Sequence, residues 1–251
     1  MIIDYPKEAH IPGLRCLWQE AFGDTDIFLD HFFRTGFAPR RCRCVLIQNK
    51  PVAALYWFDC RWQDKKIAYI YAVATAESHR GQGLCHALME DTRLLLQGSG
   101  YAGIALVPAK SALFDFYEAM GYGCFGGIRQ WQCTAGKQPA ALEELAPDQY
   151  ARLRQEFLPA NSVLQEGPLL QFLGTYARFY KGNDFLLCCA DDDGRLMGYE
   201  LLGNTHAAPE SLAALGFATG TFRTPGDSPF AMYLSLTDDP ASPRYLAFAL
   251  D

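Results

Sequence analysis

One stretch of the sequence, residues 67–85, constrains the fold more than any other. Residues 67–76 form an almost uncharged apolar run, which predicts a strand buried on both faces. A short polar loop with two glycines follows, and from Leu84 apolar residues recur at helical spacing. Such a loop suits a phosphate because helix N-termini present free N–H groups, the helix dipole favours an anion and glycine lets a ligand approach closely. The sequence therefore predicts a pyrophosphate site at residues 80–85.

Two common phosphate-binding motifs do not fit this loop. The dinucleotide fingerprint needs a third glycine, but Leu84, Cys85 and His86 follow Gly83. The P-loop needs a Lys followed by Ser or Thr after its second glycine, and neither is present. From these residues alone, an ordinary turn before a helix stays open as the alternative.

A second segment follows the loop at the distance that one helix and one strand would take up. Residues 101–107 are predicted to form another buried strand, and residues 112–120 a helix that Gly121 ends. Phe116 and Tyr117 lie on the apolar stripe of that helix. Taken alone, this position makes Tyr117 one more aromatic residue of the core.

Together the two segments resemble the GNAT acetyltransferase superfamily. The loop is similar to its coenzyme motif, Q/R-x-x-G-x-G/A, with Ser78 in place of the first residue, and the run from Phe116 to Tyr122 is similar to its F-Y-x-x-x-G-F/Y element. The resemblance implies acetyl-coenzyme A as the acyl donor and transfer of acetyl to a primary amine by direct attack. It also implies a set of residues that hold the coenzyme: Val73, Ala74, Arg80, Gly81, Gln82, Gly83, Leu84, Cys85 and Phe116.

The resemblance also implies catalytic roles. In relatives a backbone N–H of the strand before the loop, here near Val73, grips the thioester carbonyl, and a Tyr at the position of Tyr117 protonates the departing sulfur. No carboxylate lies on the predicted strand to serve as the base, so Glu77 and Asp251 are the candidates. Asp251 is a candidate because the chain's own terminal carboxylate acts as the base in some tandem-GNAT enzymes. Asp59 and a chain of waters are the alternatives.

The order of predicted elements divides the chain into two domains. The resemblance implies an α/β GNAT fold for residues 1–134, in which helices flank a central, mixed and splayed sheet, and residues 135–139 look like a linker. Residues 140–251 repeat this outline without the glycine loop, so we expect a smaller, degenerate GNAT-like α+β domain that shapes the acceptor site. An independent α+β domain is the alternative. Within this half, apolar spacing predicts a helix over residues 169–180 and a last strand over residues 245–250.

Composition narrows the classes of function. The 251 residues are 50% hydrophobic and carry a net charge of −6 with no dense run of Lys or Arg, which argues against nucleic acid. No apolar run approaches a membrane span and the first residues lack the features of a secretory leader, so we expect a cytoplasmic protein. The nine cysteines are scattered, without zinc spacing, which predicts free thiols and no structural metal.

Three functions follow from these observations. The favoured one is an acyl-coenzyme-A-dependent N-acyltransferase. A coenzyme-A-binding regulatory module without turnover and an interaction protein that kept only the fold are the alternatives. The acceptor stays open among small amines, antibiotics, polyamines and peptide N-termini, and the acidic balance weakly favours a cationic one.

Overall fold

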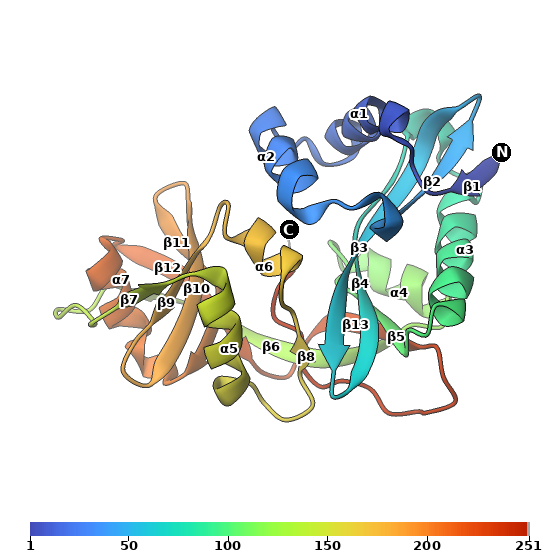
Figure 1. Cartoon of the computed structure of the whole chain (residues 1–251). Helices are drawn as coiled ribbons and strands as arrows, with labels where there is room; N and C mark the ends of the chain where they lie inside the picture. Colours follow the sequence, from blue (N-terminus) through green and yellow to red (C-terminus); the bar gives the residue numbers. More distant parts are fainter. Residues whose placement is uncertain (250–251) are drawn as a thin grey trace. The chain divides into compact units, whose positions relative to one another are not determined.

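The computed structural model describes residues 1–249, which form two compact units (Figure 1). The first unit comprises residues 1–60, 64–123 and 232–241, and the second comprises residues 61–63, 124–231 and 242–249. This division differs from the predicted boundaries in three ways. Residues 61–63 and residues 124–134 belong to the second unit, and residues 232–241 belong to the first.

The first unit contains a mixed sheet with the strand order β1-β2-β3-β4-β5-β13, in which β4 and β5 run parallel. The predicted mixed sheet flanked by helices is thereby confirmed. Its elements are β1 (Ile2–Asp4), α1 (Ile11–Phe22), α2 (Asp26–His31), a π-helix (Phe32–Gly36), β2 (Cys42–Ile47), β3 (Lys50–Trp62), β4 (Lys65–Thr75), α3 (Leu84–Gly98), β5 (Gly103–Leu106), α4 (Ala112–Glu118) and the end of β13 (Ser228–Ser235), with short 3₁₀ turns at Glu8–His10, Pro39–Arg41 and Glu77–His79.

Strand β3 is buried on both faces because helices cover both sides of the sheet. Leu55 and Trp57 pack in a core cluster with Leu88 of α3. The intervening Tyr56 points the other way, where its ring lies 5.1 Å from that of Trp18 in α1. Figure 1 shows α1 and α2 on one side of β3 and β4 and α3 on the other. This arrangement explains the nearly continuous apolar sequence of the central strands.

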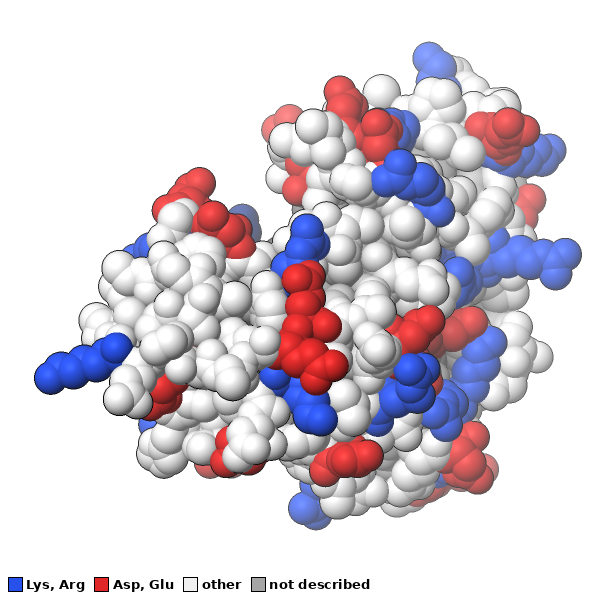
Figure 2. Space-filling model, turned by 60° about the vertical axis from the view of Figure 1, so that its left-hand side comes forward, with Lys and Arg blue, Asp and Glu red and all other residues white. Residues whose placement is uncertain are grey.

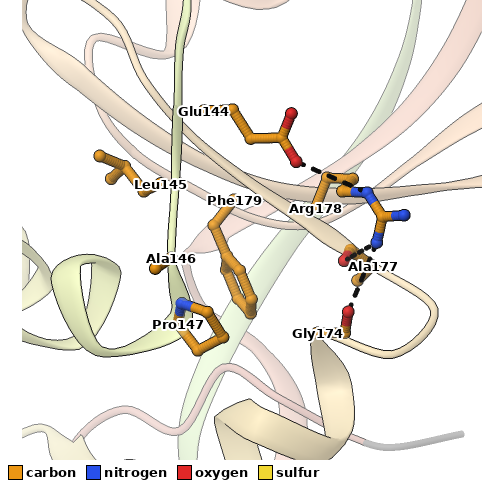
Figure 3. Close-up of a pocket in the computed structure, with 8 residues that line it drawn as sticks. All are labelled: Glu144, Leu145, Ala146, Pro147, Gly174, Ala177, Arg178 and Phe179. Carbon is orange, nitrogen blue, oxygen red and sulfur yellow. Dashed lines mark hydrogen bonds and ion pairs between the residues drawn. The ribbon is translucent and has the colours of Figure 1, made fainter.

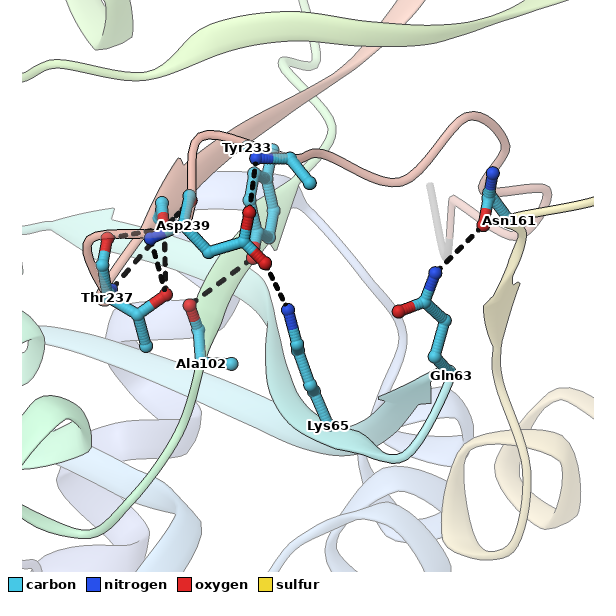
Figure 4. Close-up of polar contacts among 9 residues, drawn as sticks. Gln63, Lys65, Ala102, Asn161, Tyr233, Thr237 and Asp239 are labelled. Carbon is cyan, nitrogen blue, oxygen red and sulfur yellow. Dashed lines mark hydrogen bonds and ion pairs between the residues drawn. The ribbon is translucent and has the colours of Figure 1, made fainter.

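A strand from late in the sequence completes the first sheet. Residues 232–235 of β13 pair antiparallel with β5, from Met232 opposite Leu106 to Ser235 opposite Gly103. The ring of Tyr233 occupies the space beside Gly103, where an added Cβ would lie 2.1 Å from the Tyr233 hydroxyl. That hydroxyl donates to the carbonyl of Ala102, and an ion pair between Lys65 and Asp239 fixes the turn that follows (Figure 4).

The second unit contains a sheet with the order β6-β12-β11-β10-β9-β7, in which β11 and β12 run parallel. The short β8 pairs with Arg61 and Trp62 at the end of β3, and Gln63 donates to Asn161 nearby (Figure 4). The elements of the second unit are β6 (Gly123–Thr134), β7 (Glu143–Leu145), α5 (Pro147–Phe157), β8 (Val163–Leu164), α6 (Pro168–Leu173), β9 (Arg178–Lys181), β10 (Phe185–Asp192), β11 (Arg195–Gly203), a 3₁₀ turn (Thr205–Ala207), α7 (Ala208–Leu215) and β12 (Thr219–Pro225).

The helix predicted over residues 169–180 is wrong in its second half. Helix α6 ends at Leu173, and Thr175 closes a turn by donating its N–H and its hydroxyl to the carbonyl of Phe172. Phe179 and Tyr180 lie in β9, where they pair with β10. Their apolar spacing fits a helix, but strand pairing overrides it.

The last strand, predicted over residues 245–250, is not formed within its described part. Tyr245 makes an isolated parallel bridge to Ser162, with no strand around it in residues 245–249. The buried side-chain amide of Gln165 satisfies the backbone of Phe248 instead, accepting from its N–H at 3.0 Å and donating to its carbonyl at 2.8 Å. A side chain thus takes the place of a neighbouring strand.

Candidate functional site

The predicted loop lies directly after β4 and is bound to its own surroundings. The N–H of Ala76 donates to the carbonyl of Val52 at 2.8 Å, which fixes the end of the strand. Arg80 donates from Nε to the carbonyl of Thr75 at 3.2 Å, so the loop folds back on β4. These bonds position the loop ahead of α3.

The N-terminus of α3 is open to a ligand. Gly83 is its N-cap residue and has φ 75°, and no side chain caps the helix. Gly81 has φ 73°, and nothing lies within 4 Å of the position that a Cβ would take at either glycine. No acidic residue lies in the first turn. A 15-residue helix with uncapped N–H groups at its positive end is a site for an anion.

The two parallel strands of the first unit separate beside this loop. Pairs join β4 to β5 only from Ile67–Gly103 to Tyr69–Ala105, whereas β4 continues to Thr75. The predicted splay is therefore present in the pairing. The last pair lies four residues before Val73, near which the resemblance implies that the thioester carbonyl is bound.

A strained residue lies in the part of β4 that does not pair with β5. Ala72 has φ 50°, a conformation that non-glycine residues rarely adopt. Ile70 and Val73 both pack on the α3 side, while Tyr71 contacts Trp18 of α1, so Ala72 is the extra residue of a bulge. Backbone strain of this kind concentrates at active sites. This bulge could not be predicted from the sequence, because alanine is not typical of a residue with positive φ.

Tyr117 is brought beside the first turn of α3. Its side chain is 7% exposed, and its ring lies 5.2 Å from Phe116 and 5.8 Å from Tyr122. Burial, and secondarily the thiol of Cys85, raise the pKa of Tyr117 well above its usual value. Burial also raises the pKa of Cys85 to about 11. Tyr117 is therefore a protonated phenol at neutral pH, the form that can donate a proton.

The predicted bases lie in different surroundings. Glu77 is exposed, beyond the end of β4, and its backbone N–H donates to the carboxylate of Glu20. Asp59 accepts from the hydroxyl of Tyr101 and pairs with Lys66 at 3.6 Å, so it belongs to a structural network. Asp251 lies outside the described residues.

The second unit has a pocket of about 400 Å³ at the start of α5 (Figure 3). Pro147 and Phe179 form its apolar wall. Arg178 lies at its rim, paired with Glu144 at 3.6 Å and bonded to the carbonyls of Gly174 and Ala177. Because its one cation is already neutralised, this pocket resembles no anion or catalytic site.

Other features of the described residues bear on ligands. Within residues 1–249, no three His, Cys, Asp or Glu side chains are arranged to hold a metal ion, and all nine cysteines are free. No helix in this part of the chain is long and apolar enough to cross a membrane. Basic and acidic side chains are interspersed on the face shown in Figure 2, without a broad field of one sign.

Comparison with known proteins places this site in a family context. Residues 3–125 match a family model described as an acetyltransferase (GNAT) domain. A search of curated proteins gave no match.

Solved structures resemble nearly the whole chain. A GCN5-related N-acetyltransferase from Kribbella flavida is 17% identical with a TM-score of 0.69. The match covers 92% of this chain and 70% of that protein's chain. A probable N-acyltransferase from Enterococcus faecalis is 14% identical with a TM-score of 0.70, and the match covers 94% of this chain and 72% of that protein's chain. A GCN5-related N-acetyltransferase from Anabaena variabilis is 15% identical with a TM-score of 0.70, and the match covers 94% of this chain and 73% of that protein's chain. These similarities show the fold.

Proposed function

We propose that the protein is an N-acyltransferase that moves acetyl from acetyl-coenzyme A to a primary amine by direct attack, and the match of residues 3–125 to an acetyltransferase (GNAT) domain model supports this. Acyl transfer from acyl-coenzyme A is the general chemistry of that family. The observation that carries the proposal is the open N-terminus of α3, with Gly81 and Gly83 before it and Tyr117 beside its first turn.

The residues of the loop bind the coenzyme in this proposal. Backbone N–H groups between Arg80 and Cys85 donate to the pyrophosphate, and the guanidinium of Arg80 adds positive charge. Val73 and Ala74 line the splayed part of β4 where the pantetheine arm enters. Phe116, whose side chain is 39% exposed, offers an apolar contact next to Tyr117.

The reaction forms one bond and breaks another. The neutral amine nitrogen attacks the thioester carbon, a backbone N–H near Val73 stabilises the developing oxyanion, and the C–S bond breaks. Tyr117 gives its proton to the departing thiolate. The amine proton passes to the base, so an amide and a free thiol are the products.

We propose a carboxylate of Asp251 or Glu77 as that base. Residues 244 and 245, which precede Asp251 in the sequence, are bonded to the backbone around β8 in the second unit. Arg244 donates its N–H to the carbonyl of Asn161, and the carbonyl of Tyr245 accepts from Val163. Glu77 is the alternative because it follows β4 directly.

The second unit is, in this proposal, a degenerate copy that binds no coenzyme. Its parallel strands β11 and β12 pair over three positions, as β4 and β5 do, and a loop and a helix connect them in both units. The start of α7 in the second unit differs from the start of α3 in the first. The side chain of Asn204 caps the N–H of His206, and Pro209 removes a donor from the first turn of α7. Its role in shaping the acceptor site stays a prediction.

The test is release of free thiol from acetyl-coenzyme A in the presence of a panel of primary amines. We expect amine-dependent release by the wild-type protein. The Tyr117→Phe variant should lose kcat by roughly a hundredfold or more with little change in coenzyme affinity. Tyr122→Phe is the matched control, since Tyr122 is also buried and adjoins Tyr117.

Two other outcomes separate the alternative functions. Coenzyme binding without thiol release for any amine would support a regulatory module. A folded protein that binds no coenzyme would leave an interaction protein that kept only the fold.

A further inference from the structure

The loop between β4 and α3, residues 76–83, consists of a hydrogen-bonded first half and a free second half. In the first half, the N–H of Ala76 donates to the backbone of β3, and those of His79 and Arg80 donate to carbonyls within the loop at 2.9 and 3.2 Å. In the second half, no hydrogen bond within the described residues uses the N–H groups of residues 81–83. The bonds of the first half therefore determine where these free N–H groups point.

One N–H group of the first half is bound by a side chain that is distant in the sequence. The N–H of Glu77, the first residue of the 3₁₀ turn after β4, donates to the carboxylate of Glu20 in α1. Glu20 has no ion pair with a basic side chain in the part of the chain that the structure describes. A carboxylate that accepts from the first N–H of a turn stabilises it as a capping residue does, and here the cap comes from another element.

Helix α1 gives this carboxylate a firm support. Leu17 and Trp18 are 4% and 2% exposed, and the ring of Trp18 lies 5.1 Å from that of Tyr56 in β3. The indole N–H of Trp18 also donates to the carboxylate of Asp24, just beyond the helix, at 2.7 Å. Because α1 is packed on the sheet in this way, Glu20 ties the loop to the sheet.

The charge of Glu20 is unfavourable for stability where it lies. Glu20 is in the last turn of α1, at the negative end of the helix dipole, and no basic residue lies in that turn. The residue that it binds, Glu77, carries a second negative charge. Residues that break an electrostatic rule of this kind are expected at functional sites.

We infer that Glu20 is a positioning residue for coenzyme A, which acts through the N–H of Glu77 and aligns the free N–H groups of residues 81–83 with the pyrophosphate. The inference rests on the proposed function, since the loop that Glu20 holds is the proposed coenzyme site. Glu20 does not itself contact the coenzyme, because its negative charge would repel the phosphates.

The test is calorimetry with coenzyme A on the full-length protein and its variants. Glu20→Ala removes the acceptor of the Glu77 N–H and should weaken binding by roughly fivefold. Glu20→Gln keeps an oxygen that can accept from this N–H and loses a negative charge, so it should bind at least as tightly as the wild type. Gln19→Ala is the matched control and should bind normally, because Gln19 lies on the same turn of α1 and donates to Asp26 of α2 at 2.8 Å.

Two further measurements separate positioning from a general structural role. Glu20→Ala should raise KM for acetyl-coenzyme A and leave kcat and the KM of the amine little changed. Its Tm should not fall, because the variant removes a charge from the negative end of a helix dipole.

The outcomes distinguish this inference from the proposed function. Equal affinity for coenzyme A in the wild type and in Glu20→Ala overturns the inference alone. Weakened binding in Glu20→Gln, or a fall of its kcat, also overturns the inference alone, because the charge and not the hydrogen bond would then matter. Absence of coenzyme binding by the wild-type protein overturns the proposed function, and this inference with it.

Discussion

A buried ion pair in the second unit gives the sharpest stability prediction. Arg154 and Glu200 are 1% and 0% exposed, and two bonds of 2.7 and 3.0 Å join them. The hydroxyls of Tyr150 and Tyr245 donate to the same carboxylate at 2.8 and 3.2 Å. Every charge in this cluster therefore has a partner of opposite charge or a hydrogen bond.

Replacing Glu200 by Gln keeps the volume but leaves the guanidinium of Arg154 buried without a counter-charge. Breaking a buried pair in this way costs about 3–5 kcal/mol. For a chain of this size, that loss should lower Tm by roughly 10 °C. The exposed pair between Arg93 and Glu90 is the matched control, because side chains 30% and 47% exposed contribute little. Glu90→Gln should therefore cost less than about 1 kcal/mol.

The assay is urea unfolding followed by circular dichroism. A double variant, Arg154→Met with Glu200→Gln, should recover most of the lost stability, because it removes both charges together. A loss below about 1.5 kcal/mol for Glu200→Gln, or a double variant no more stable than the single one, would refute the reasoning.

Three further predictions concern the first unit and the end of the chain. Because the pKa of Tyr117 is raised, its phenol keeps its proton where an ordinary Tyr would lose it, so kcat measured up to about pH 10 should show no fall from loss of this acid; a fall of half by that pH contradicts the assignment. A fragment of residues 1–134 lacks Met232 and Leu236, which are 1% and 6% exposed in the core, so it should be insoluble or unfolded by circular dichroism; a folded, monomeric fragment would disprove this. Deleting Asp251, or extending the chain beyond it with glycines, should leave Tm unchanged and reduce thiol release severely, and full activity in the extended protein would rule out Asp251 as the base.

The central part of the fold could be predicted because its signals are local. The apolar run before the loop, the two glycines and the helix that follows specify strand, turn and helix without help from distant residues. Glycine at positions 81 and 83 matches the positive φ found there. The helix ending at Gly121 followed from the same kind of reasoning, although α4 stops at Glu118.

What the sequence could not specify depends on distant pairing. Nothing local in the sequence says that Met232 to Ser235 join β5 of the first unit. Phe179 and Tyr180 satisfy a helical pattern and form a strand because β10 is available to pair with them. The bulge at Ala72 is likewise imposed by the surrounding sheet.

The aromatic ring contacts beneath α1 could be predicted only in part. The concentration of Phe between residues 28 and 37 is visible in the sequence. Its meeting with Tyr56 and Tyr71 depends on how β3 and β4 alternate beneath α1.

The most direct test of the central claim is calorimetry of coenzyme A binding to the wild-type protein and to two loop variants, Gly81→Val and Gly83→Pro. No atom lies within 4 Å of the Cβ position at either glycine, so we expect the strain at positive φ to stay within the loop and both variants to fold. Binding should fall by at least about tenfold, because Gly83→Pro removes an N–H donor and Gly81→Val crowds the approach and disfavours the positive φ of the loop. Gly216→Val is the matched control, because Gly216 has φ 80° and equally open space at the end of α7. One coenzyme bound per chain by the wild-type and control proteins, with weakened binding in both loop variants, is the predicted result. Equal affinity in all four folded proteins would contradict the assignment of this loop as the coenzyme site.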